Sequence, residues 1–147
     1  ISSIAIPKRK ERLSVLALVF IYYSMTYYIF RYWNTTLLNL LQPYLSFLFA
    51  GLILLLLLTL ITLKWKISIH AASIAALTGG VTALTFIAQP IINLKQIFLI
   101  NAVLLIFIGM VSFSRMYLKA HSVTQILAGI SLGFSLVFSL VFNQFYI

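Results

Sequence analysis

The sequence almost lacks acidic residues, because Glu11 is the single Asp or Glu among 147 residues. Paired carboxylates for acid–base catalysis, acidic proton relays and oxygen-rich cation sites are therefore excluded. Cysteine is absent as well, which excludes disulfides, iron–sulfur clusters and thiolate metal sites. Histidine, lysine, arginine and hydroxyl groups remain as the available chemistry, and we expect a site that uses no metal and no other cofactor.

Charge of either sign is scarce, since 7% of the residues are charged and 63% are hydrophobic. In soluble domains about a quarter of the residues are charged. This composition indicates an integral membrane protein. The formal net charge of +9 favours anionic partners, and for a chain in lipid these are anionic phospholipids or lipid phosphates. We expect membrane lipids as partners and no nucleic acid.

Five apolar stretches are long enough to cross a membrane as helices, which requires roughly 20 residues. They contain no Lys, Arg, Asp or Glu, and unbroken apolar runs favour helices over barrel strands, in which polar residues alternate with apolar ones. They predict an all-α integral membrane protein, an antiparallel transmembrane helix bundle with five spans in a single domain over residues 1–147. The stretches are Leu13–Phe30, Leu37–Leu63, Ile69–Ala88, Ile97–Phe113 and Ile126–Phe142.

The ends of two stretches need comment. The second stretch is too long for a perpendicular span, and Pro43 predicts its true start, which leaves Leu37–Gln42 at the membrane interface. The chain opens at Ile1 rather than at methionine, so we expect a longer protein whose N-terminal part is missing here.

Lysine and arginine are distributed unequally between the links. One side of the bundle receives only Arg31 and Lys95. Because cytoplasmic links are enriched in basic residues, the asymmetry predicts a cytoplasmic amino end and a carboxyl end outside. The basic residues of the richer side are Lys8, Arg9, Lys10, Arg12, Lys64, Lys66, Arg115 and Lys119.

Small residues occur within two of the expected spans. Gly129 and Gly133 form a G-x-x-x-G pattern in the last span, and Gly79 and Gly80 are adjacent in the third. Such residues let helix backbones approach closely in lipid. We favour packing within one bundle over dimerisation. The aromatic residues Trp33 and Trp65 at span ends are typical of the membrane interface.

Two polar segments interrupt this apolar chain, and both histidines lie in them. They are "KWKISIH", Lys64–His70, and "SRMYLKAHSVTQ", Ser114–Gln125. In an antiparallel array both links fall at one end of the bundle. His70 stands at a helix start, where unpaired N–H groups favour an anion. Gln125 follows His121 by one helical turn and is placed to orient its imidazole.

Each polar residue also has a purely structural interpretation. Lys64 can extend its ammonium group from a helix end to the interface. Arg115 and Lys119 can be ordinary positive-inside residues. The combination of two histidines, serines and basic residues on one membrane face, with no carboxylate to neutralise them, nevertheless favours a phosphate site.

The polar segments resemble signatures of the type 2 phosphatidic acid phosphatase and vanadium haloperoxidase superfamily. Its third signature, S-R-x5-H-x3-D, is matched by Ser114 and Arg115 and by His121, which follows Arg115 after five intervening residues. Gln125 stands in place of the aspartate. "ISIH" is similar to its second signature, P-S-G-H, and retains Ser68 and His70. The first signature, K-x6-R-P, is absent because no Arg-Pro pair occurs. The layout resembles small membrane members of Bacteroidetes-type bacteria, which implies the bacterial cytoplasmic (inner) membrane.

The resemblance implies a hydrolase that cleaves a lipid phosphate monoester or diphosphate through a phosphohistidine intermediate, without a metal. His121 would be the nucleophile, His70 the general acid and base, and Gln125 the residue that orients His121. The phosphate-binding residues would be Lys66, Ser68, Ser114 and Arg115.

A second interpretation belongs to a different class. The missing first signature and Gln125 favour a catalytically degenerate member of the same fold, serving as a structural or assembly subunit with a protein partner in a membrane complex. Retention of both histidines with Ser68 and Arg115 favours the enzyme. A transporter or channel is less supported, because the spans carry no Lys, Arg, Asp or Glu along an ion path. The sequence leaves enzymatic activity open.

Overall fold

The computed structural model describes residues 9–32, 42–87 and 93–145. Regular structure within these ranges is helical throughout, which confirms the all-α prediction. Each helix is long and apolar enough to span a membrane. Residues 1–8, Trp33 and most of the predicted interfacial segment Leu37–Gln42 lie outside the described residues. The helices are α1 (Arg9–Tyr32), α2 (Gln42–Lys64), α3 (Ile69–Ile87), α4 (Leu94–Tyr117) and α5 (Val123–Phe142).

Some helix ends agree with the predicted bounds, among them the start of α3 at Ile69 and the end of α5 at Phe142, and others differ. α2 begins at Gln42, next to Pro43, as predicted, because a proline in the first turn has no N–H to lose. α4 is longer than predicted. Asn93 caps its start by accepting a hydrogen bond from the Lys95 N–H at 3.1 Å, and the helix continues to Tyr117 rather than ending at Phe113.

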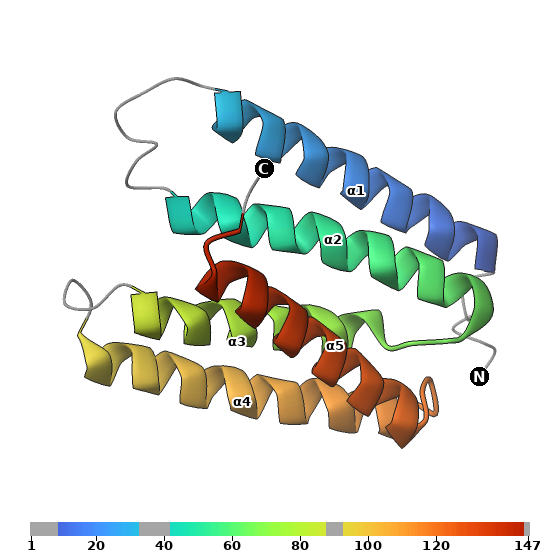
Figure 1. Cartoon of the computed structure of the whole chain (residues 1–147). Coiled ribbons are helices and arrows are strands. Elements are labelled where there is room, and N and C mark those ends of the chain that lie inside the picture. Colours follow the sequence, from blue (N-terminus) through green and yellow to red (C-terminus); the bar gives the residue numbers. More distant parts are fainter. Residues whose placement is uncertain (1–8, 33–41, 88–92, 146–147) are drawn as a thin grey trace.

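Successive helices run in opposite directions (Figure 1). The α2–α3 link and the α4–α5 link therefore lie at one end of the bundle, together with the start of α1. The two polar segments, which are far apart in sequence, are thus brought to the same face of the membrane.

Small residues bring α3 and α5 together more closely than any other pair of helices. A Cβ atom on Gly79 would lie 2.5 Å from the backbone oxygen of Phe134, and one on Gly133 would overlap the backbone of Ala72. These distances leave no room for a side chain. Packing of the G-x-x-x-G pattern within the bundle is therefore confirmed.

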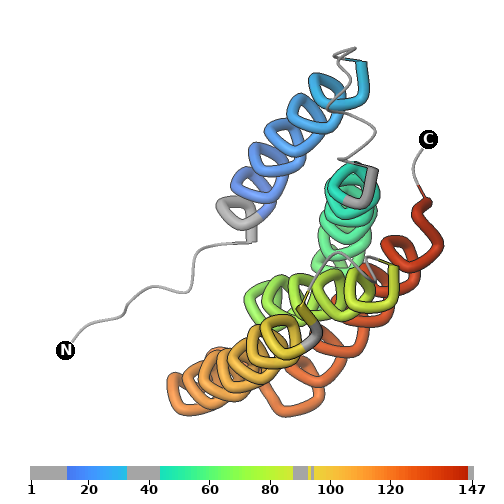
Figure 2. The backbone as a smooth tube through the Cα atoms, turned by 90° about the vertical axis from the view of Figure 1, so that its left-hand side faces the viewer, coloured from blue at the N-terminus to red at the C-terminus, as the bar shows by residue number. Residues whose placement is uncertain are grey.

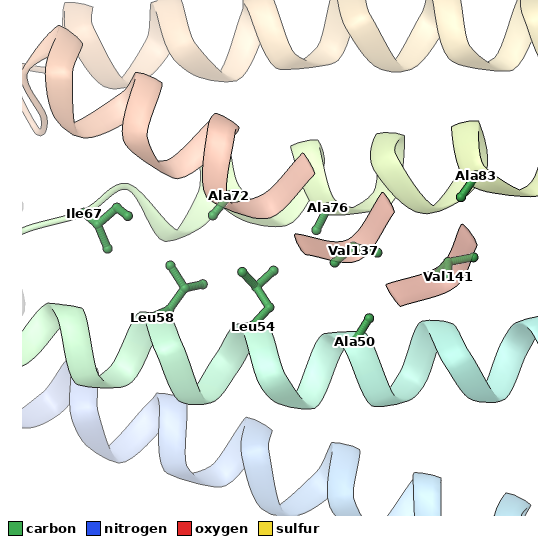
Figure 3. Close-up of a cluster of buried hydrophobic side chains, with 9 residues drawn as sticks. All are labelled: Ala50, Leu54, Leu58, Ile67, Ala72, Ala76, Ala83, Val137 and Val141. Carbon is green, nitrogen blue, oxygen red and sulfur yellow. The ribbon is translucent and has the colours of Figure 1, made fainter. Parts of the chain in front are cut away.

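The remaining helices are arranged around this pair. α4 packs on α3, and α2 contacts mainly α5 and α1. Figure 2 shows α1 set apart from α3, α4 and α5. Figure 3 shows Leu54 and Leu58 projecting from α2 toward the α3–α5 pair. The core formed there consists of Ala50, Leu54, Leu58, Ile67, Ala72, Ala76, Ala83, Val137 and Val141.

Candidate functional site

The site begins with the turn that ends α4. Lys119 adopts a left-handed conformation, with φ of 51°. The Lys119 N–H donates to the Met116 carbonyl at 2.9 Å, and the Ala120 N–H donates to the Arg115 carbonyl at 3.0 Å. This is a Schellman motif, in which the residue in the left-handed position is usually glycine. The chain reverses here although the sequence has no glycine at this point.

The turn explains the spacing between Arg115 and His121. The His121 N–H also donates to the Arg115 carbonyl, at 3.4 Å. Ser122 follows as the N-cap of α5. The five residues between Arg115 and His121 therefore form a turn that folds back on the last turn of α4. This turn places His121 at the same end of the bundle as Arg115.

Gln125 contacts two residues at the start of α5, Ser122 and His121. Its backbone N–H donates to Ser122 Oγ at 3.4 Å, and its side-chain Oε1 accepts from the Ser122 N–H at 3.2 Å, which together form a capping box. The same Oε1 lies 3.1 Å from His121 Nδ1. The contact between His121 and Gln125 that the sequence suggested is present. The capping box was missed, although Ser-x-x-Gln is its sequence pattern.

The double contact of Gln125 determines the tautomer of His121. A backbone N–H is only a donor, so the amide atom that faces Ser122 N is the oxygen. An oxygen is only an acceptor, so the Nδ1 atom that faces it carries the hydrogen. In the neutral His121 ring the lone pair is therefore on Nε2.

The start of α3 is bound directly to the start of α5. Ser68 is completely buried, and its N–H donates to the backbone carbonyl of Gln125 at 3.3 Å. Its Oγ accepts from the Ala71 N–H at 3.4 Å. A Cβ atom on Gly129 would lie 2.7 Å from the Ser68 carbonyl oxygen. Glycine at this position is what allows the two helix starts to touch.

His70 and Arg115 belong to the same two polar segments. His70 is exposed and Arg115 is half-buried in the last turn of α4. The guanidinium of Arg115 is close enough to interact electrostatically with the imidazole of His70. Ser68, His70 and Arg115 thus lie at the end of the bundle that also carries the hydrogen-bonded pair of His121 and Gln125.

Two further residues expected at the site occupy less central positions. Lys66 is half-buried in the link that precedes Ser68. Ser114 is exposed and lies in α4 rather than in a link. It is about 100° around the helix from Arg115, so its hydroxyl points in a different direction. Phosphate binding by Lys66, Ser68, Ser114 and Arg115 stays a prediction.

The part of the chain that carries the candidate site also matches a known protein family. The family model described as the PAP2 superfamily matches residues 62–146. This match runs from the end of α2 through α3, α4 and α5, and it includes both polar segments. Searches of curated proteins and of solved structures give no match. Because the family model covers more than half of the chain, the protein belongs to the PAP2 superfamily.

Proposed function

We propose that the protein is a membrane phosphatase that hydrolyses a lipid phosphate monoester or diphosphate. The observation that carries this proposal is the hydrogen bond from the Ser68 N–H to the Gln125 carbonyl, which joins the starts of α3 and α5 and so brings the two polar segments together. Membership of the PAP2 superfamily supports phosphatase-like chemistry. The site lies at a membrane face, which suits an amphiphilic substrate with its phosphate at the interface.

The residues of the site suit an anion. Arg115 and Lys66 supply positive charge, and the only carboxylate side chain of the sequence is that of Glu11. Hydrogen bonds from a guanidinium to phosphate are among the strongest in proteins. Ser68 Oγ accepts from the Ala71 N–H, which leaves its hydrogen to be donated to a phosphate oxygen that reaches this completely buried position.

In the first step, Nε2 of His121 attacks phosphorus in line with the lipid ester bond. The P–N bond forms as the P–O bond to the lipid breaks. His70 is protonated once the anionic phosphate is bound beside it, because an opposite charge favours the charged form, and it gives its proton to the departing lipid oxygen. Arg115 and Lys66 stabilise the charge that the equatorial oxygens carry in the transition state.

In the second step, water attacks the phosphohistidine. His70, now neutral, takes a proton from the water as its oxygen bonds to phosphorus. The P–N bond breaks, inorganic phosphate leaves and His121 recovers its lone pair on Nε2. His70 is then protonated again, ready for the next substrate.

Gln125 limits the expected rate. Its carbonyl oxygen holds His121 in the reactive tautomer, but an amide does not offset the positive charge that the ring gains during attack. In a serine protease, replacement of the orienting aspartate by asparagine lowers kcat by about four orders of magnitude. We therefore expect slow turnover compared with a carboxylate at this position.

A catalytically degenerate subunit is the second candidate function. It is favoured by the capping box, because that contact gives Gln125 a structural role independent of catalysis. The absence of an Arg-Pro pair from the sequence points the same way. In this case the basic residues would hold an anionic lipid headgroup while the protein assembles with a partner in the membrane.

Phosphate release by the purified protein separates these functions. Lipid phosphate monoesters and diphosphates in mixed micelles are the substrates, and His70→Ala and His121→Ala are the variants. Ser135→Ala is the matched control, because Ser135 is exposed on α5 and its hydroxyl is bonded within the helix. We expect release by the wild type and the control, and loss of at least about 100-fold in both histidine variants. Absence of release from every substrate would favour the structural subunit.

A further inference from the structure

Ser112 carries a buried hydroxyl that no part of the described chain satisfies. Its Oγ atom is inaccessible to solvent and has no hydrogen-bond partner within the part of the chain that the structure describes. Serines in helices commonly bond to the carbonyl of the preceding turn. Ser73 does so at 2.9 Å and Ser135 at 2.6 Å. Ser112 is an exception, although a buried polar group without a partner lowers stability.

The position of Ser112 relative to α3 follows from one interhelical hydrogen bond. Thr82 Oγ1 donates to Asn101 Oδ1 at 2.9 Å and fixes the register of α3 against α4. The helices are antiparallel (Figure 1). Ser112 follows Asn101 in α4 by as many residues as Ala71 precedes Thr82 in α3. Ser112 is therefore level with Ala71 along the bundle.

This level is the inner end of the candidate site. Ala71 is completely buried, and its N–H donates to Ser68 Oγ. Ser112 precedes Arg115 by three residues, so the two side chains lie on the same side of α4. The unsatisfied hydroxyl is thus one turn deeper in the membrane than Arg115, beside the first turn of α3.

The surrounding groups indicate which kind of partner is missing. The Arg115 guanidinium is only a donor, and Ser68 Oγ already accepts from the Ala71 N–H. The Arg115 guanidinium and the hydroxyls of Ser68 and Ser112 all have hydrogens to donate. A ligand that accepts hydrogen bonds from all three must carry several acceptor oxygens. We propose that Ser112 is a further phosphate-contacting residue, which donates its hydroxyl hydrogen to an oxygen on the membrane-facing side of the bound phosphate.

This inference rests on the proposed function and makes a distinctive prediction for Ser112→Ala. The substitution removes a hydroxyl that has no partner in the described chain, so the thermal midpoint should stay unchanged or rise. The Kd for inorganic phosphate should increase by about 10-fold, since hydrogen bonds to charged groups are among the stronger ones. A residue important only for packing would show the opposite pattern.

The experiment is calorimetric titration of the purified full chain in detergent, with inorganic phosphate and a short-chain lipid phosphate as separate probes. The variants are Ser112→Ala, Ser112→Thr, which keeps a hydroxyl, and the control Ser135→Ala. We expect equal weakening of both probes in Ser112→Ala, recovery in Ser112→Thr and no change in Ser135→Ala.

Other outcomes overturn the inference. An unchanged Kd in Ser112→Ala shows that the hydroxyl does not contact the phosphate. Weakening of the lipid phosphate alone shows that Ser112 contacts the ester or lipid part instead of the shared phosphate. If the wild type binds neither probe, the proposed function fails together with the inference, whereas wild-type binding with an unaffected Ser112→Ala overturns the inference alone.

Discussion

Gly129 provides the sharpest structural test, because it determines whether the starts of α3 and α5 touch. A Cβ atom there would lie 2.7 Å from the Ser68 carbonyl oxygen, which is backbone and cannot rotate away. Gly129→Ala should therefore push the start of α3 from the start of α5. The Ser68 N–H bond to the Gln125 carbonyl at 3.3 Å should weaken with it.

The magnitude follows from two opposing effects. Gly→Ala within a helix stabilises it by about 0.5–1 kcal/mol. An extra methyl group in a well-packed interior costs about 1–3 kcal/mol. We expect Gly129→Ala to be less stable than the wild type by a net amount of roughly 1 kcal/mol, and phosphate release to fall further because His70 and His121 are displaced relative to one another.

Gly109→Ala is the matched control. Gly109 lies in α4, and a Cβ atom there would meet nothing within 4 Å. This variant should retain activity and gain up to about 1 kcal/mol of stability. Reversible unfolding in detergent measures the stabilities, and phosphate release measures activity. Equal stability and activity of Gly129→Ala and Gly109→Ala would refute the contact between the two helix starts.

Three further predictions concern the turn, the orienting residue and the topology. Lys119→Gly should raise the free energy of unfolding by about 1 kcal/mol, because it removes a side chain from a position with φ of 51°; a lower unfolding midpoint would contradict the Schellman turn. Gln125→Glu should preserve the capping box and add the missing charge, and Gln125→Asp should add the charge alone. Turnover should rise in both, more in the former, whereas unchanged turnover would show that charge beside His121 is unimportant. Cysteines at Lys119, in the link before α5, and at Asn143, directly after α5, should react from opposite sides of the membrane, with Lys119→Cys on the cytoplasmic side. The chain has no native cysteine to interfere, and labelling of both positions from one side would contradict a spanning α5.

The helices were predictable because long apolar runs leave few alternatives in lipid, but several of their ends were not. The predicted fourth span stopped at Phe113, where the apolar run stops. The helix itself continues to Tyr117, since polar residues such as Ser114 and Arg115 are compatible with a helix that has reached the interface. The turn that ends it uses Lys119 in the left-handed position, where the sequence offers no glycine as a signal.

The site was predictable where the spacing is local or where the antiparallel topology alone brings two links to one end of the bundle. One helical turn separates His121 from Gln125, so their contact follows from the sequence. The position of Ser112 beside the first turn of α3 depends on the register between α3 and α4, and the bond between Thr82 and Asn101 that fixes this register joins distant parts of the chain. The contact of Gly129 with Ser68 depends on tertiary packing in the same way.

Trapping the covalent intermediate tests the central claim most directly. The wild-type protein is mixed with a lipid phosphate carrying radioactive phosphorus and quenched within one turnover, and the labelled peptide is mapped. We predict a label that is stable in base and labile in acid, attached to His121 and absent from His121→Ala. A label that persists in His121→Ala, or phosphate release by a wild type that never becomes labelled, would contradict the phosphohistidine mechanism.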